Sequence, residues 1–555
     1  MLSSRISSWS ATTFTIALAL LAAPSSAQLW NKTIQTSYGP VSGFKYFNTS
    51  TTEEYFNTSV SSVTAFLGIP YAADTGYQNR WKPPQPRESW NNTLAATSFG
   101  APCPSNSEPT SSEDCLSLNI WTSAESSGEA MPVLVWNQGS GETSDDSWWY
   151  GGGMAMKDVV FVSFNRRDDV FGYLAHPELN AEGLARDNFN TSGNYGVLDF
   201  LEVLKWVQSN IANFGGDPDR VTIAGQSFGS SQVYHAVNSE LFSGLFVGGI
   251  SQSGIRYPYD TMLAGLATSY VTMNDALVHG ENYTEFHNAT SISQLRELSM
   301  EELLVGSDER LNGTWIWWVT ALSTNYPLVF KPVLDGYVLP MKYLEQLVEG
   351  PANDVPLITG NTKDESGVIL PTPGYTLAEY KEYQTLKYGN LSSRYFSLYP
   401  FSDNVTEAGL AWNDAARDLS LVSTWAYATN WVKSASSPIY TYFWDHAPPG
   451  QEQGAFHQSE IMYALDAMYA NTDRYPFTDE DYAIAEVMSG YWTNFVRTGN
   501  PNEGGAYTGK LTHWYPNGEA THSVMRLGNG WGNRTTAAPK KVDFMMDYFS
   551  QQTPY

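Results

Sequence analysis

Short runs of apolar residues recur along this chain and alternate with segments whose apolar positions follow a helical period. One such helical segment, residues 198–211, precedes the apolar run 220–224. Runs of this length are typical of buried parallel strands, and strands that alternate with helices form sheets covered on both faces. The pattern predicts an α/β fold with a large, mostly parallel central sheet. The expected strands are 34–44, 63–69, 132–136, 159–164, 220–224, 247–251, 356–359 and 438–443.

The run 220–224 leads directly into Gly225-Gln-Ser227-Phe-Gly229, where a helix is expected to begin. This order is typical of a nucleophile elbow, in which a serine stands on a strained turn and glycines remain where a Cβ would clash. The first N–H groups of the helix also offer hydrogen bonds to a developing oxyanion. A serine in an ordinary glycine-rich turn is the simpler alternative, but the flanking strand and helix favour Ser227 as a nucleophile.

A serine nucleophile needs a general base, which is most often a histidine. Among the eight histidines, His457 lies in a loop shortly after the expected strand 438–443. His446 lies closer to that strand and is the alternative.

The base needs a carboxylate that orients it, expected between the serine and the histidine in chain order and just after a strand. Glu365 follows the expected strand 356–359 and meets this condition. Its neighbour Asp364 is an obvious alternative, and Asp335 is a weaker one.

Residues 1–27 have the features of a secretory signal peptide. Arg5 supplies the positive charge, residues 14–23 the apolar core, and residues 25–27 a small-residue cleavage site. The apolar core is too short to span a bilayer, and no other stretch reaches the roughly 20 apolar residues of a transmembrane helix. The sequence therefore predicts a soluble, secreted, extracellular protein without stable membrane association, in which residues 28–555 form one domain.

Two further features fit an oxidising, extracellular environment. Cys103 and Cys115 are the only cysteines, and in such a compartment two cysteines this close are expected to form a disulfide. Many Asn-x-Ser/Thr sequons predict N-linked glycans. The sequons begin at Asn31, Asn48, Asn57, Asn91, Asn190, Asn282, Asn288, Asn312, Asn390, Asn404 and Asn533.

The formal net charge of −27 argues against nucleic acid and anionic membranes as partners. The chain contains no repeats, charge blocks or low-complexity linkers that would divide it. A serine, a histidine and a carboxylate need no metal or organic cofactor, so none is expected.

Several blocks of this sequence resemble those of the type-B carboxylesterase/lipase family, which includes cholinesterase-like and fungal lipase-like α/β-hydrolases. The similarity covers essentially the whole mature chain. It implies an α/β-hydrolase fold and a catalytic triad of Ser227, His457 and Glu365. The similar blocks are 66–72, 112–121, 193–229, 360–365, 457–461 and 492–502.

The chain departs from that family in its oxyanion loop, which usually reads close to His-Gly-Gly-Gly-Phe. Residues 135–142 read Val-Trp-Asn-Gln-Gly-Ser-Gly-Glu. By position, the oxyanion donors would be the backbone N–H groups of Ser140, Gly141 and Phe228. A carboxylate at Glu142 would oppose a nearby oxyanion unless it points away or is neutral.

Further departures flank the nucleophile. The family usually has Glu before the serine and Ala after it, whereas this chain has Gln226 and Phe228. Loss of a carboxylate beside the histidine weakens the support for an imidazolium. A phenyl group beside Ser227 is expected to crowd the pocket.

The resemblance also suggests which residues line the substrate pocket. The segment that family members use for acyl selectivity resembles residues 326–330, so Tyr326 and Leu328 are expected there, with Glu142 close by. Tryptophans that either add an aromatic wall or pack in the core are Trp148, Trp149, Trp315, Trp317 and Trp318.

The sequence thus predicts a secreted serine ester hydrolase that acts on small-molecule esters through an acyl-enzyme. Because of the atypical oxyanion loop, a dedicated biosynthetic enzyme of the same fold is the main alternative, catalysing transesterification, lactonisation or elimination. A non-catalytic adhesion protein is the second, but relatives of that kind typically lose the serine.

Overall fold

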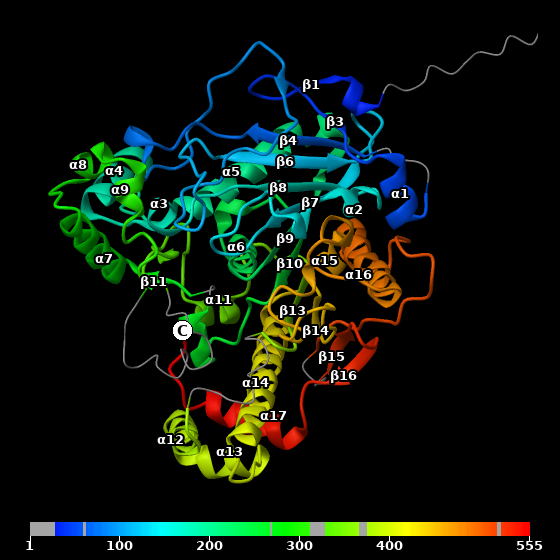
Figure 1. The fold of residues 1–555 in the computed structure, drawn as a ribbon. Coiled ribbons are helices and arrows are strands. Elements are labelled where there is room, and N and C mark those ends of the chain that lie inside the picture. Colours follow the sequence, from blue (N-terminus) through cyan, green and yellow to red (C-terminus); the bar gives the residue numbers. More distant parts are fainter. Residues whose placement is uncertain (1–27, 59–62, 267–268, 311–327, 366–374, 519–522) are drawn as a thin grey trace, which may run out of the picture.

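The computed structural model describes residues 28–58, 63–266, 269–310, 328–365, 375–518 and 523–555 (Figure 1). Its centre is an eleven-stranded sheet that crosses the whole molecule. In spatial order its strands are β16 (Gly532–Thr535), β15 (Ser523–Leu527), β14 (Ile439–Trp444), β13 (Leu357–Thr362), β10 (Gly248–Gln252), β9 (Gly216–Gln226), β7 (Met131–Asn137), β8 (Val160–Phe164), β6 (Ser117–Thr122), β4 (Thr64–Pro70) and β3 (Phe44–Lys45).

Seven neighbouring strands of this sheet, from β8 to β15, are parallel, and the strands at both ends are antiparallel. The expected α/β fold with a mostly parallel sheet is therefore confirmed. The expected strand 34–44 is instead divided into β1 (Thr33–Gln35), β2 (Pro40–Ser42) and β3, because a turn at Gly39 lets β1 pair back on β2. Smaller strands are β5 (Leu94–Ala95), β11 (Val271–Thr272) and β12 (Val333–Leu334).

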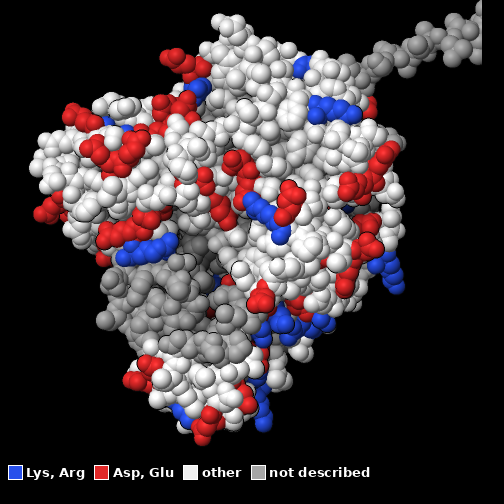
Figure 2. Space-filling view, in the orientation of Figure 1, with Lys and Arg blue, Asp and Glu red and all other residues white. Residues whose placement is uncertain are grey.

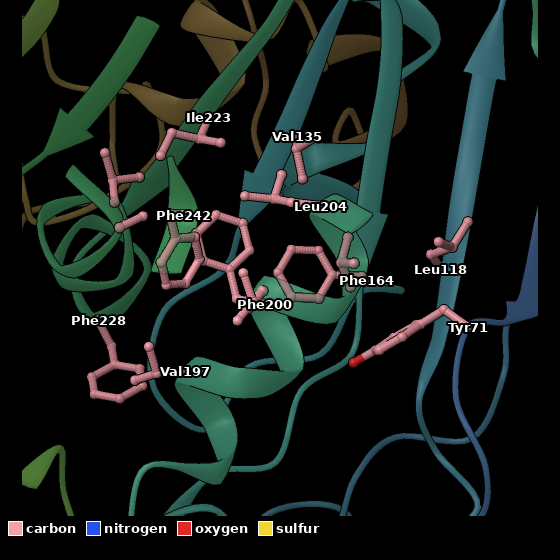
Figure 3. Packing of buried hydrophobic residues seen from close by; sticks show 14 of the residues in the cluster. Tyr71, Leu118, Val135, Phe164, Val197, Phe200, Leu204, Ile223, Phe228 and Phe242 are labelled. Atoms are coloured by element: carbon pink, nitrogen blue, oxygen red, sulfur yellow. The ribbon is translucent and has the colours of Figure 1, made fainter. Parts of the chain in front are cut away.

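Both faces of the sheet are buried, as successive residues of β7 show. Val133 and Val135 belong to one apolar cluster, and Leu134 and Trp136 to another. Helices α5 (Tyr195–Asn210) and α6 (Phe228–Val237) contribute to the first cluster, where Val135, Leu204 and Ile223 lie close together (Figure 3). Helices α15 (Ile461–Ala464) and α16 (Asp479–Thr498) contribute to the second. This two-sided burial explains why the central strands are continuous apolar runs.

The remaining helices surround this core. The 30-residue α14 (Val405–Ser434) packs with α12 (Leu377–Tyr388), α13 (Ser392–Leu398) and α17 (Pro539–Phe549) in a tyrosine-rich cluster at the lower end of Figure 1. The others are α1 (Thr49–Phe56), α2 (Gly152–Ala155), α3 (Asp169–Tyr173), α4 (Pro177–Asp187), α7 (Met273–Phe286), α8 (Ile292–Glu297), α9 (Met300–Leu304) and α11 (Tyr343–Glu349).

Three other features bear on the sequence predictions. Cys103 and Cys115 form the expected disulfide, with their Cα atoms 5.0 Å apart. Within the described ranges, no helix is both long and apolar enough to cross a membrane. Acidic side chains are spread over the face seen in Figure 2, in keeping with the net charge of −27. The expected signal peptide, residues 1–27, lies outside the described residues.

Candidate active site

Ser227 stands between β9 and α6 in a backbone conformation that non-glycine residues rarely adopt, with φ 57° and ψ −118°. The two flanking glycines make this turn possible. A Cβ at Gly225 would lie 2.4 Å from the carbonyl oxygen of Gly229, and a Cβ at Gly229 would lie 2.0 Å from that of Asn137. The predicted strand–turn–helix elbow is therefore present, with the serine at its tip.

The structure brings His457 and Glu365 together. His457 Nδ1 lies 2.5 Å from Oε2 of Glu365, which follows the carboxyl end of β13. Burial would raise the pKa of Glu365, but the hydrogen bond and charge of His457, together with the charge of Arg256, hold it below its usual range. Burial would lower the pKa of His457, and Glu365 raises it instead. Glu365 therefore stabilises the imidazolium form of His457 when the ring takes up a second proton.

The alternative residues have other partners. Asp364 accepts hydrogen bonds from Arg417 and from the backbone N–H of Ala455. Asp335 accepts from three consecutive backbone N–H groups, at residues 337–339. Neither carboxylate contacts His457.

The rival histidine is also engaged elsewhere. His446 Nε2 lies 2.8 Å from Asp481 Oδ1, and its Nδ1 lies 2.6 Å from Asn529 Oδ1. Asp481 sits in the first turn of α16, so this pair ties the end of β14 to that helix. Of the two candidate histidines, only His457 pairs with a candidate acid.

The other ring nitrogen of His457, Nε2, faces the nucleophile elbow. His457 Nε2 lies 3.0 Å from the amide nitrogen of Gln226, the residue before Ser227. With the Nδ1 proton directed at Glu365, the Gln226 amide donates to the Nε2 lone pair. The partner of Nε2 in this structure is thus Gln226 rather than the Ser227 hydroxyl.

A second buried carboxyl, which the sequence reasoning missed, lies behind the pair. Glu460 accepts hydrogen bonds from Gln252 and Tyr442, each at 3.1 Å, and its other oxygen has no partner. Burial, then the charge of Glu365, raises its pKa to about 7. The sequence signal that could have pointed to Glu460 is its position, three residues after the candidate base His457.

The expected oxyanion loop follows β7. Ser140 is exposed, and Gly141 has a positive φ of 68°. Glu142 turns back on the loop: its carboxylate accepts from the Gly139 N–H at 2.6 Å and from the side-chain amide of Gln458. Burial raises the pKa of Glu142, while these two hydrogen bonds oppose the rise. In this structure the Glu142 carboxylate is therefore hydrogen-bonded to the backbone of its own loop and to the loop that carries His457.

Two charged residues near this loop were also missed. Arg166 and Asp168 follow β8 and pair with each other, with Nε 3.2 Å from Oδ1. The Arg166 guanidinium lies 5.0 Å from the centre of the Phe228 ring. That ring is buried against Tyr173 and beside Val197 (Figure 3).

The expected pocket residues are described only in part. Leu328 is half-buried and forms an isolated bridge with Arg310, whereas Tyr326, Trp315, Trp317 and Trp318 lie outside the described residues. Trp149 is a core residue, 1% exposed. Trp148 is half-buried beside Phe456, the residue before His457.

In the described part of the chain, no group of three or more His, Cys, Asp or Glu is placed to hold a metal ion.

Comparisons with known proteins identify the family of this chain. The family model described as "Carboxylesterase family" matches residues 31–545. The chain is 30% identical over 505 residues to fumonisin B1 esterase of Sphingopyxis macrogoltabida, covering 86% of each chain. It is 29% identical over 502 residues to para-nitrobenzyl esterase of Bacillus subtilis, covering 84% of this chain and 90% of that one.

Solved structures of esterases also match this chain in fold. A PNB esterase structure superposes with a TM-score of 0.72 and 26% identity, covering 93% of this chain and 99% of the other. That fold is the α/β-hydrolase fold. The chain therefore belongs to the carboxylesterase family and is a carboxylic ester hydrolase.

Proposed function

We propose that this protein is a secreted serine esterase in which Ser227 is the nucleophile, His457 the general base and Glu365 the residue that orients it, all within a single domain over residues 28–555. The observation that carries the proposal is the 2.5 Å contact between His457 Nδ1 and Glu365 Oε2, with the opposite nitrogen turned toward the strained Ser227 elbow.

In the proposed reaction, His457 Nε2 takes the proton of the Ser227 hydroxyl while Oγ attacks the ester carbonyl carbon. Glu365 stabilises the imidazolium that forms. His457 then gives the proton to the leaving alcohol, and a water molecule hydrolyses the acyl-enzyme by the same steps. The proposed oxyanion donors are the backbone N–H groups of Ser140, Gly141 and Phe228, each worth about 3 kcal/mol in comparable enzymes.

Secretion and glycosylation are part of the proposal. The sequon asparagines that the structure describes, all of the predicted set except Asn312, are exposed. The disulfide fits an oxidising compartment as well. Mass spectrometry of the secreted protein before and after glycosidase treatment tests this part directly.

The catalytic assignment is tested by hydrolysis of nitrophenyl esters of graded acyl length, with Ser227→Ala beside wild type. We expect turnover by wild type and a loss of at least about 10³-fold in Ser227→Ala. An unimpaired rate in a folded Ser227→Ala protein would falsify the assignment of the nucleophile.

The second candidate is a dedicated biosynthetic enzyme that uses the same triad for transesterification, lactonisation or elimination. The observation that favours it is the altered oxyanion loop, in which Ser140 is exposed and Glu142 occupies the Gly139 N–H. Absence of turnover on every simple ester, combined with labelling of Ser227 by a fluorophosphonate, would select this candidate.

A further inference from the structure

Three charged side chains converge on the backbone of the oxyanion loop. Arg166 Nη2 donates to the carbonyl oxygen of Gly139 at 3.0 Å. Glu142 accepts from the N–H of the same residue at 2.6 Å. The backbone N–H of Gly141 lies near enough to the Asp168 carboxylate to lower the pKa of that group. The backbone on both sides of Ser140 is therefore held by side chains from outside the loop, namely Arg166 and Asp168.

Arg166 and Asp168 form a buried unit. The Arg166 side chain has no exposed area and that of Asp168 is 12% exposed, and Arg166 Nη2 lies 3.2 Å from Asp168 Oδ2. Burial raises the pKa of Asp168, while Arg166 and the Gly141 N–H oppose that rise. The Asp168 carboxylate thus interacts with the Arg166 guanidinium, which it orients, and with the Gly141 N–H of the loop.

The unit also reaches the other side of the nucleophile. The Arg166 guanidinium packs over the ring of Phe228, whose backbone N–H is the third proposed oxyanion donor. One side chain therefore contacts the donor loop after β7 and the first residue of α6. A buried ion pair adds little net stability compared with well-packed apolar residues, so stability alone does not account for it.

We propose that Arg166 and Asp168 are positioning residues for the acyl-transfer reaction, holding the backbone on both sides of Ser140 so that the Ser140 N–H meets the developing oxyanion. This inference rests on the function proposed above. In this chain, a charged pair just after the neighbouring strand β8 would thus hold the loop that is a run of glycines in the family pattern.

The expected effect is on the chemical step. Oxyanion donors bind the transition state more strongly than the substrate, so a displaced loop lowers kcat and leaves KM nearly unchanged. A misplacement of about 1 Å in an active site lowers the rate by about 10²-fold. Affinity for a transition-state analogue falls in the same proportion.

The chain contains its own control at the next residue. Arg167 pairs with Asp199 at 2.6 Å, donates to the carbonyl of Lys82 and lies 5.6 Å from the ring of Tyr195. Arg167 thus makes the same three kinds of contact as Arg166, but none of them to the oxyanion loop. Arg167→Lys therefore measures the effect of disturbing a buried arginine–aspartate pair that makes no contact with the oxyanion loop.

The experiment compares Arg166→Lys, Asp168→Asn and Arg167→Lys with wild type. It measures kcat and KM on a nitrophenyl ester, the inhibition constant of a trifluoromethyl ketone, and the melting temperature. We expect kcat to fall by about 10- to 100-fold in the first two variants, with KM within about threefold and inhibitor affinity falling in step. Arg167→Lys is expected to lower the melting temperature but to keep kcat within about threefold of wild type.

Several results would overturn the proposal. One is an unchanged or increased kcat in Arg166→Lys or Asp168→Asn. Another is a loss of kcat in Arg167→Lys that matches the loss in Arg166→Lys. If Arg166→Lys does not fold, Asp168→Asn, which keeps the side-chain volume, decides alone. Activity that survives Ser227→Ala would instead refute the proposed function, so the two failures are distinguishable.

Discussion

The side-chain amide of Gln226 lies 3.0 Å from Nε2 of His457, on the nitrogen opposite the Glu365 contact. The imidazole is thus held between a carboxylate on one side and a neutral amide on the other. A neutral partner supports the uncharged imidazole, because the amide donates to the same lone pair that must accept the serine proton. The residue before the nucleophile therefore influences the basicity of the proposed base.

Gln226→Glu is expected to shift the pH dependence of hydrolysis. A carboxylate beside His457 stabilises the imidazolium and raises the pKa of His457. Since the base must be neutral to accept a proton, the acidic limb of the kcat/KM profile moves to higher pH. Gln226→Ala, which removes the amide but adds no charge, is the control and is expected to move that limb much less than Gln226→Glu does. An acidic limb that does not move in Gln226→Glu would contradict this account.

Neutralising the two adjacent acids separately should distinguish their roles. Glu365→Gln removes the charge that stabilises the His457 imidazolium, so kcat is expected to fall by about 10⁴-fold. Asp364→Asn instead weakens an ion pair with Arg417, in which the Asp364 side chain is 3% exposed. We expect lower stability with kcat within about tenfold of wild type. Steady-state kinetics and thermal melting of both variants test this, and equal losses of kcat would refute the assignment.

The His446–Asp481 pair should stabilise the fold in a pH-dependent way. Burial would lower the pKa of His446, but its hydrogen bonds to the Asp481 carboxylate and to the Asn529 side-chain oxygen raise it above the unfolded value. The hydrogen bonds of Asp481, including those from His446 and Thr478, overcome its burial and hold its pKa well below the usual range. A raised histidine pKa stabilises the fold fully below the unfolded pKa of about 6.5, and this stabilisation is lost as pH rises through the folded value.

His446→Gln is therefore expected to destabilise the protein more at pH 5.5 than at pH 8.5. The loss at the lower pH should be about 1 to 3 kcal/mol, as for a buried carboxylate that loses a charged hydrogen-bond partner. Urea unfolding at both pH values measures it. A loss that is larger at pH 8.5 would show the opposite linkage and refute the argument.

Removing the disulfide should affect stability first. Replacing Cys103 and Cys115 together by serine opens a short loop, which costs about 3 kcal/mol on the chain-entropy model. The loop also contacts the oxyanion loop, since Ser107 Oγ lies 3.4 Å from the Gly141 carbonyl oxygen. Denaturation of wild type and the double variant, with and without reductant, checks the expectation. Reductant should lower the stability of wild type alone.

The sequence predicted most of the fold and the pairing in the site because both depend on local order along the chain. Buried parallel strands such as β7 and β8 are apolar runs that stand out without any tertiary information. The elbow at Ser227 is specified by two glycines four positions apart, Gly225 and Gly229. Strands β15 and β16 were missed, because β15 is a short run interrupted by Arg526 and β16 is a partly exposed edge strand, so neither has that continuous apolar signal.

The unpredicted parts are those that require contacts between distant segments. Arg166 and Asp168 carry no sequence motif, and their relation to Gly139 follows only from the pairing of β8 with β7. The direction of the Phe228 ring likewise depends on Tyr173 and α5. Glu142 was expected near the oxyanion, but its hydrogen bond to Gln458 depends on how two loops meet.

That contact between Glu142 and Gln458 joins positions 316 residues apart in the chain. Gln458 directly follows His457, and Glu142 ends the oxyanion loop. A substitution at one of these positions therefore removes a hydrogen bond from a half-buried polar group at the other. Across relatives, evolution should tolerate changes at 142 and 458 mainly as pairs. The two positions are expected to covary, and the oxyanion loop and the histidine loop to be inherited as one unit.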